Sequence, residues 1–397
     1  MVSFLLSFFM IALLVGQSAM DAASVLLVVV MLYKSYQWKQ QRNPHYRLFN
    51  KKGFDVLFLI WFIVVGAGFY FTKPVDQDWI KYLVEFKWIL FFYIINAALI
   101  FRPIREEHLF WICSIFATAC VYAIAVAFLK YDPVVGDLPS LFGDHGAFSR
   151  TGGLYSDSMT FAHCYGLLLC IFIGWSLTYS QWSDPRKYLV WFVTITGAAA
   201  ILLSFTRGVW LALAIAAIFM AFVYSKRVAI LALTSIGGLG ALAFNYWPEF
   251  QERVMYSFTE RNYDQKRWHL WQANWEIIKE NWIVGVGYGE NKKMLPALYE
   301  KLGITDQTIV SHAHNQYIHW LAGTGVLGLA CILSIYICFL VFSYRKFKDA
   351  DIRKPFERGI ALGVFGAQIC LIAGGLFEAN LEHSKVKYVI SFLWALL

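Results

Sequence analysis

Long apolar blocks separated by short polar connections dominate this sequence. The stretches at 56–70, 109–129 and 359–376 are long enough, or nearly so, to cross a hydrocarbon core that takes about 20 helical residues. The sequence lacks the alternating segments of about ten residues that mark an outer-membrane β-barrel. The pattern therefore predicts an all-α integral membrane protein.

Twelve segments are predicted to be transmembrane helices of one polytopic membrane domain over residues 1–397. They lie at 2–16, 20–33, 54–72, 83–101, 109–129, 159–179, 188–205, 208–225, 228–246, 326–344, 359–376 and 387–397. The composition agrees, because 59% of the residues are hydrophobic and only 15% are charged. A soluble chain of this length does not need so much apolar surface, since a single core stops growing well before this size.

The distribution of lysine and arginine over the short connections predicts the orientation. Eighteen basic residues fall on alternate connections, within 34–52, 102–105, 186–187, 226–227 and 345–358, whereas the other short connections contain eight. Cytoplasmic connections carry the excess of positive charge. We therefore expect the first set and both termini to be cytoplasmic. The net charge of +8 also suits contact with anionic lipids and lipid phosphates.

This orientation places two longer segments on the outer face of the membrane. Residues 130–158 form a smaller loop, and residues 247–325 form a loop of more than 70 residues, where connections are usually under ten. Long loops with their own structure are usually functional. We therefore expect any chemistry to lie on the outer face.

Within the large loop, aromatic and apolar residues recur every three or four positions and predict an amphipathic helix. The apolar face would consist of Trp268, Trp271, Trp275, Ile278 and Trp282, and the polar face of Lys266, His269, Gln272, Glu276 and Lys279. Such a helix suits the membrane interface, and it equally suits packing on the end of the bundle. Either position holds Arg267 near the headgroup plane.

A histidine lies where the large loop meets the tenth span. His314 and Asn315 precede the glycine pair Gly325 and Gly328, which would share one helix face and permit close packing. An imidazole at a helix entrance can accept a proton near neutral pH. His312 and His319 compete for this role, because spacing alone does not choose among the three. His312 and His314 do not make a convincing metal site without further ligands.

Two arginines could bind an anionic substrate. Arg207 lies in a tight turn between two spans on the outer face, where positive charge is disfavoured. Arginine at such a depth is costly, so it is usually paired or functional. Guanidinium groups bind phosphate oxygens through two hydrogen bonds, so Arg207 and Arg267 together could hold a diphosphate.

Two further motifs are weaker. Asp76 and Asp78 form an Asp-x-Asp triplet on the outer face, which could bind a metal ion or could favour a helix N-terminus. The segment 285–289, Gly-Val-Gly-Tyr-Gly, superficially resembles a nucleotide loop but lacks the preceding strand. We expect it to be a turn that closes the tryptophan-rich helix.

Taken together, these motifs resemble the bacterial O-antigen ligases of the larger O-antigen ligase/polymerase superfamily. The resemblance covers the twelve-span layout and is sharpest over 204–328, whereas the first 150 residues agree only in hydropathy. It rests on Ser204-Phe-Thr-Arg207-Gly, on Arg267-Trp268 with Trp271, on the 285–289 segment, and on His314-Asn315 with Gly325-x-x-Gly328.

The resemblance implies a metal-independent, inverting glycosyltransferase with a GT-C-type bundle in the bacterial inner membrane. Such an enzyme transfers a glycan from undecaprenyl diphosphate to a hydroxyl of lipid A–core on the periplasmic face. Arg207 and Arg267 would bind the donor diphosphate, His314 would be the base for the acceptor hydroxyl, and Asn315 would orient His314 or the acceptor. We expect contact with membrane lipids, and we expect no cofactor, metal or nucleic acid.

Two other functions stay open at this stage. An O-antigen polymerase or a protein-glycosylating member of the superfamily would differ in its acceptor, which no residue discloses. A transporter would belong to another class and should show charges at the membrane midplane and broken helices in repeated halves. The unusual residues of this chain lie instead at the outer face, which favours the transferase.

Overall fold

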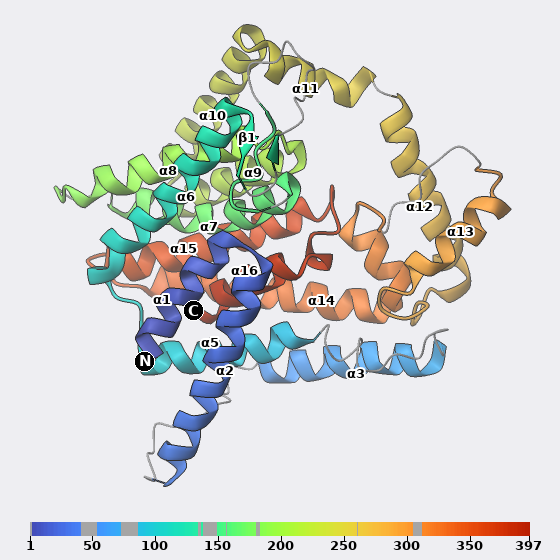
Figure 1. The fold of residues 1–397 in the computed structure, drawn as a ribbon, viewed down its shortest axis with the longest axis horizontal. Helices are drawn as coiled ribbons and strands as arrows, with labels where there is room; N and C mark the ends of the chain where they lie inside the picture. The colour runs from blue at the N-terminus through green and yellow to red at the C-terminus, as the bar shows by residue number, and fades with distance from the viewer. Residues whose placement is uncertain are drawn as a thin grey trace.

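The computed structural model describes residues 2–40, 54–72, 86–133, 136–137, 149–155, 157–179, 183–259, 261–304 and 312–397. Within these ranges the chain forms fifteen α-helices, two short 3-10 helices and one small antiparallel ribbon (Figure 1). Asp76 and Asp78 lie outside the described residues, so the two interpretations of this triplet stay open.

The elements follow one another along the chain as follows: α1 (Val2–Val15), α2 (Gln17–Gln40), α3 (Phe54–Thr72), α5 (Lys87–Phe101), η1 (Glu106–His108), α6 (Leu109–Leu129), β1 (Tyr131–Asp132), β2 (Gly136–Asp137), α7 (Ser158–Tyr179), α8 (Arg186–Leu202), α9 (Arg207–Tyr224), α10 (Lys226–Tyr246), α11 (Pro248–Thr259), α12 (Arg261–Asn281), α13 (Asn291–Lys301), α14 (Gln316–Asp349), α15 (Pro355–Gly374), η3 (Asn380–Glu382) and α16 (Ser384–Ala395). In the ribbon, Tyr131 pairs with Asp137 and Asp132 pairs with Gly136.

The predicted all-α class is confirmed, and a helix lies at each of the twelve predicted segments. Among the described residues, eight helices are long and apolar enough to cross a membrane: α2, α3, α6 together with η1, α7, α9, α10, α14 and α15. Helices α1 and α5 are apolar but shorter. The number of twelve spans and the orientation therefore stay predictions.

Helices α7 and α15 pack side by side at the centre of the bundle (Figure 1). Glycine makes their close approach possible, because a Cβ atom at Gly174 would lie 2.8 Å from the backbone nitrogen of Gly363. Near the C-terminus of α7, Trp175 and Thr178 donate hydrogen bonds to the carbonyls of Phe356 and Pro355, at 3.0 and 2.9 Å. This pair is the rigid frame from which the residues after α15 extend.

Helix α10 is almost entirely exposed, whereas α7 and α15 are mostly buried. It is apolar along its length, yet Ala229 is its one buried residue, and Ile230, Leu231, Leu239 and Leu242 are all more than half exposed. A soluble protein rarely exposes such a continuous apolar surface. The hydrocarbon core of a bilayer would cover it, which agrees with an integral membrane protein.

The predicted large loop is helical over most of its described residues. It contains α11, α12 and α13, and the last two lie together at one end of the molecule (Figure 1). Gly325, with φ of +63°, divides α14 into a first short helix and the long apolar helix that follows. The long part therefore begins close to residue 326, where the tenth span was predicted to start.

The predicted orientation can be tested by labelling two exposed positions. We expect a cysteine at Lys301, in α13, to react from outside the cell with an impermeant thiol reagent, and a cysteine at Asp349 to stay unlabelled. The background is a variant in which the seven native cysteines are replaced. Labelling at residue 349 but not at residue 301 would reverse the topology and exclude an outward-facing site.

Candidate functional site

His314 lies in a turn that the N-terminus of α14 holds in place. The side chain of Asn315 caps this helix, because its oxygen accepts hydrogen bonds from the backbone N–H groups of Tyr317 and Ile318 at 3.0 and 3.1 Å. Its amide group donates to the carbonyl of Leu376 at 3.1 Å. Asn315 thus fastens the turn to the end of α15, and His314 adopts the left-handed conformation with φ of +47°.

A buried carboxylate contacts the predicted base. Glu378, which follows α15, is 2% exposed, and its Oε2 lies 2.8 Å from Nδ1 of His314. An ionised carboxylate can only accept hydrogen bonds, so Nδ1 of His314 must carry the proton. The Nε2 atom then has a free lone pair for a proton from a substrate. A carboxylate that orients an imidazole in this way is the arrangement used for general bases.

The surroundings keep Glu378 ionised. Burial by itself would raise the pKa of this carboxyl group, but the hydrogen bond from His314 and the electrostatic interactions with the imidazoles of His314, His312 and His163 outweigh it and lower the pKa to about 2. The backbone N–H of Ala379 also donates to Oε1, at 3.0 Å. Glu378 therefore carries a fixed negative charge at the side of His314.

The two competing histidines have different partners. His312 shares Glu378, with 3.2 Å between its Nδ1 and Oε1, and its ring packs edge-on against the ring of His314. Burial, chiefly, lowers the pKa of His312 to about 4, so this imidazole is neutral at neutral pH. His319 is 1% exposed and lies 3.3 Å from Glu382 and 3.0 Å from the amide of Asn291. Of the three histidines, His314 makes the shortest contact with a carboxylate, and its role as the base stays a prediction.

Arg207 begins α9, directly after the turn that the sequence predicted to be tight. Phe205 in this turn has φ of +51°, and Arg207 donates from Nη1 to the carbonyl of Arg253 at 3.3 Å. Two more arginines stabilise the turn. Arg253 donates to the carbonyl of Phe205 at 3.1 Å, and Arg150 donates to the carbonyl of Ser204 at 2.8 Å. The described residues thus bring three guanidinium groups to the N-terminus of one helix.

This arginine turn lies beside the segment that carries Glu378. Gly208, next to Arg207, packs so closely on Phe377 that a Cβ atom at position 208 would lie 2.8 Å from the Phe377 Cβ. Phe377 precedes Glu378 in the chain. The N-terminus of α9 carries a partial positive charge as well. Positive charge is therefore concentrated close to the His314–Glu378 pair.

Arg267 lies on α12, the helix that contacts the turn carrying His314. It is half-buried on α12, one helical turn before Trp271. The indole nitrogen of Trp271 donates a hydrogen bond of 2.8 Å to the carbonyl of Ala313, between His312 and His314. Each arginine is therefore near a residue that contacts the His314–Glu378 pair's own segments. Gly208, next to Arg207, packs on Phe377, and Trp271, one turn after Arg267, binds the carbonyl of Ala313.

Three of the tryptophans on α12 point away from the bundle. Trp268, Trp275 and Trp282 are each more than half exposed. The buried side of the helix consists of Leu270, Ala273, Asn274, Ile277 and Ile278. The sequence left two positions open for this helix, and α12 does pack against α14 and α13 through its buried side, as one of them requires. An exposed tryptophan stripe agrees with the other possibility, a helix at the membrane interface.

The Gly-Val-Gly-Tyr-Gly segment is a turn after α12, as predicted. Its three glycines all have positive φ, and Val286 and Gly287 donate hydrogen bonds to the carbonyls of Ala322 and Gly323 at 3.1 and 2.9 Å. A Cβ atom at Gly325 would collide with the carbonyl of Ile283. Gly325 therefore permits a close approach as predicted, but to this turn rather than to another transmembrane helix. Gly328 instead faces Thr324 of its own helix.

Sequence reasoning missed Glu378, Arg150 and Arg253. Glu378 follows an apolar block by only a few residues, and an acidic group so close to the membrane could have been recognised as costly and worth explaining. Arg150 and Arg253 lie far from Arg207 in the sequence, and no motif links them.

A family comparison matches residues 192–333 to the model described as O-antigen ligase. The matched segment includes Arg207, Arg267 and His314, whereas Glu378 lies beyond it. The chain matched none of the curated proteins with which it was compared. Residues 192–333 therefore match the O-antigen ligase family, and the resemblance that the motifs carry is confirmed over this segment.

Proposed function

We propose that this protein is an O-antigen ligase of the bacterial inner membrane. It transfers a glycan from undecaprenyl diphosphate to a hydroxyl of lipid A–core on the periplasmic face and so completes lipopolysaccharide. The O-antigen ligase domain supports glycan transfer. The observation that carries the proposal is the contact of His314 with the buried Glu378 beside the arginine turn, because it would supply a base and an anion site near each other.

The reaction needs one proton acceptor and one site for a leaving diphosphate. Nε2 of His314 takes the proton of the acceptor hydroxyl while the hydroxyl oxygen attacks the anomeric carbon of the glycan. The bond between this carbon and the diphosphate oxygen breaks, and attack from the opposite side inverts the configuration. The electron pair stays with the undecaprenyl diphosphate, so negative charge develops on its phosphate oxygens.

Arginine side chains are suited to stabilise this charge. Arg207 and Arg267 would contact the diphosphate oxygens, since a guanidinium group presents two parallel N–H donors to a phosphate. Arg150 and Arg253 hydrogen-bond to the turn before Arg207 and add positive charge around it. Fixed positive groups in a site that excludes water are an efficient means of transition-state stabilisation.

Because arginines neutralise the diphosphate in this mechanism, we expect transfer by the purified protein to survive EDTA. The Asp76→Ala/Asp78→Ala double variant should likewise keep substantial activity. Both are measured as glycan transfer from lipid-linked donor to acceptor in detergent. If chelation abolished transfer and added magnesium or manganese restored it, the arginine mechanism would be wrong.

The ligase and its alternatives differ in the products of a deletion strain. Loss of all long-chain lipopolysaccharide, with accumulation of lipid-linked glycan, supports the ligase. Core with a single repeat unit would identify a polymerase, and normal lipopolysaccharide with loss of a protein-linked glycan would identify a protein-glycosylating enzyme. A transporter would leave glycan transfer by the purified protein undetectable. Gel profiles of the strain, with and without the restored gene, and the transfer assay of the purified protein together distinguish these outcomes.

A further inference from the structure

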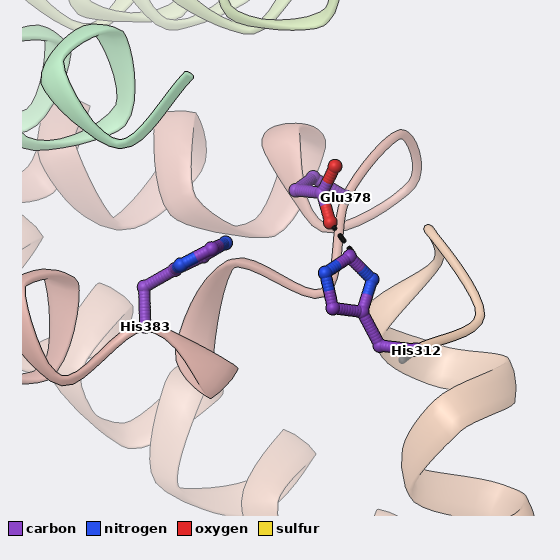
Figure 2. Close-up of side chains that lie close together, drawn as sticks. All are labelled: His312, Glu378 and His383. Atoms are coloured by element: carbon purple, nitrogen blue, oxygen red, sulfur yellow. Dashed lines mark ion pairs between the residues drawn. The ribbon is translucent and has the colours of Figure 1, made fainter. Parts of the chain in front are cut away.

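Three potential metal ligands converge beside the proposed base. His312 comes from the turn before α14, Glu378 from the segment after α15, and His383 from the segment before α16 (Figure 2). One ligand atom from each residue lies within 4.8 Å of those of the other two. Figure 2 shows the His383 ring and the Glu378 carboxylate both directed toward the ring of His312. From the sequence alone, the only histidine pair considered for a metal site here was His312 with His314, and two ligands are too few.

The chemistry of these three groups suits a transition-metal ion. Nδ1 of His312 and Oε1 of Glu378 lie 3.2 Å apart. This is close to the roughly 3.3 Å that separates two ligands of one tetrahedral zinc ion, each about 2.0–2.2 Å from the metal. Calcium and magnesium prefer six or more oxygen ligands, whereas zinc readily accepts two imidazoles and one carboxylate.

A buried imidazole nitrogen in this cluster has no partner. Nε2 of His383 is buried and has no hydrogen-bond partner among the described residues. A buried nitrogen that is left unsatisfied would gain a partner when a metal ion binds.

We propose that His312, Glu378 and His383 form a zinc site that inhibits transfer when it is occupied. The zinc ion would be bound by three protein ligands, with a fourth position open to water. Glu378 is shared, because its other oxygen accepts the hydrogen bond from His314. A metal ion on Glu378 would neutralise the carboxylate and repel a proton arriving on His314, which would slow the reaction. This consequence rests on the proposed function, whereas zinc binding itself does not.

Zinc binding is tested without reference to activity. The full-length protein, purified in detergent without a polyhistidine tag, is titrated with zinc by calorimetry. We expect one tight site per chain, and we expect His312→Ala and His383→Ala each to weaken the affinity by at least about 10-fold. Loss of an outer-shell partner alone costs about 10–100-fold, so loss of a ligand should cost no less. His108→Ala, at an exposed histidine that precedes α6, is the matched control and should not change the affinity.

Inhibition is then measured as transfer against zinc concentration. We expect zinc to slow transfer by wild-type protein, EDTA to restore it, and His383→Ala to need at least about 10 times more zinc for the same inhibition. Equal zinc affinity in wild type and His383→Ala would overturn the site, and stimulation by zinc, or tight binding without inhibition, would overturn its inhibitory role. If the protein bound zinc here but never transferred glycan, the proposed function alone would fail.

Discussion

His314→Ala is expected to slow glycan transfer by about 10²–10⁴-fold, the usual cost of losing a general base, while the donor still binds almost normally. The reason is that His314 takes a proton only as the acceptor attacks, whereas the arginines bind the donor beforehand. The measurement is donor affinity and transfer rate in the same detergent preparation, at the same expression level.

Variants of the other histidines provide the comparison. His312→Ala should have a milder effect, because His312 shares Glu378 but is not proposed to contact the acceptor. His319→Ala should also be milder, since His319 contacts Glu382 in a separate buried cluster. His269→Ala, on α12, is a control for removing an imidazole elsewhere. Near-normal transfer by His314→Ala would exclude it from the chemistry, and loss of donor binding would place it in the phosphate site.

Glu378→Gln tests whether the carboxylate positions His314. Glutamine preserves the size of the side chain but removes the charge that stabilises the imidazolium form. We expect transfer to fall by about 10²-fold or more, as when the orienting carboxylate of a catalytic triad is replaced by its amide. The ascending limb of the pH–rate profile should also move to lower pH, which a merely structural role would not cause. An unchanged profile with unchanged rate would remove Glu378 from the mechanism.

The helices were predictable because membrane insertion imposes a simple requirement on the sequence. A segment that crosses lipid must be apolar over its length, so blocks such as 109–129 mark α6 within a few residues. Periodicity did not reveal which face of α12 is buried. In a membrane protein the tryptophan-rich face can face lipid headgroups, and here the buried face includes Asn274, whose side chain accepts a hydrogen bond of 2.8 Å from Asn291.

The candidate site was only partly predictable for a related reason. His314, Arg207 and Arg267 occur in local motifs, so the resemblance could identify them. Glu378 lies 64 positions after His314, and the two meet because α14 and α15 pack together and Asn315 binds the carbonyl of Leu376. A single sequence contains no signal for such a long-range contact. The same limitation concealed the convergence of Arg150 and Arg253 on the turn before Arg207.

The two proposed phosphate ligands should not tolerate exchange for lysine. We expect Arg207→Lys and Arg267→Lys each to weaken donor binding by roughly 10- to 150-fold. Charge-assisted hydrogen bonds contribute about 1.5–3 kcal/mol each, and lysine cannot reproduce the parallel pair of donors. Arg207→Lys should have the larger effect, because its guanidinium group also donates to the carbonyl of Arg253 and thereby connects α11 to the turn.

The arginine variants are compared with a substitution of the same kind outside the site. Arg186, at the start of α8, forms ion pairs with Glu106 and Asp184 that are largely exposed, so Arg186→Lys should leave donor binding unchanged. Affinity for undecaprenyl diphosphate without its glycan separates phosphate binding from sugar binding, and both site variants should lose it. If Arg207→Lys bound this lipid as tightly as Arg186→Lys does, the diphosphate would have to lie elsewhere. Transfer would then depend on Arg207 only through the turn that its side chain stabilises, and Arg207→Lys would lower the rate without lowering donor affinity.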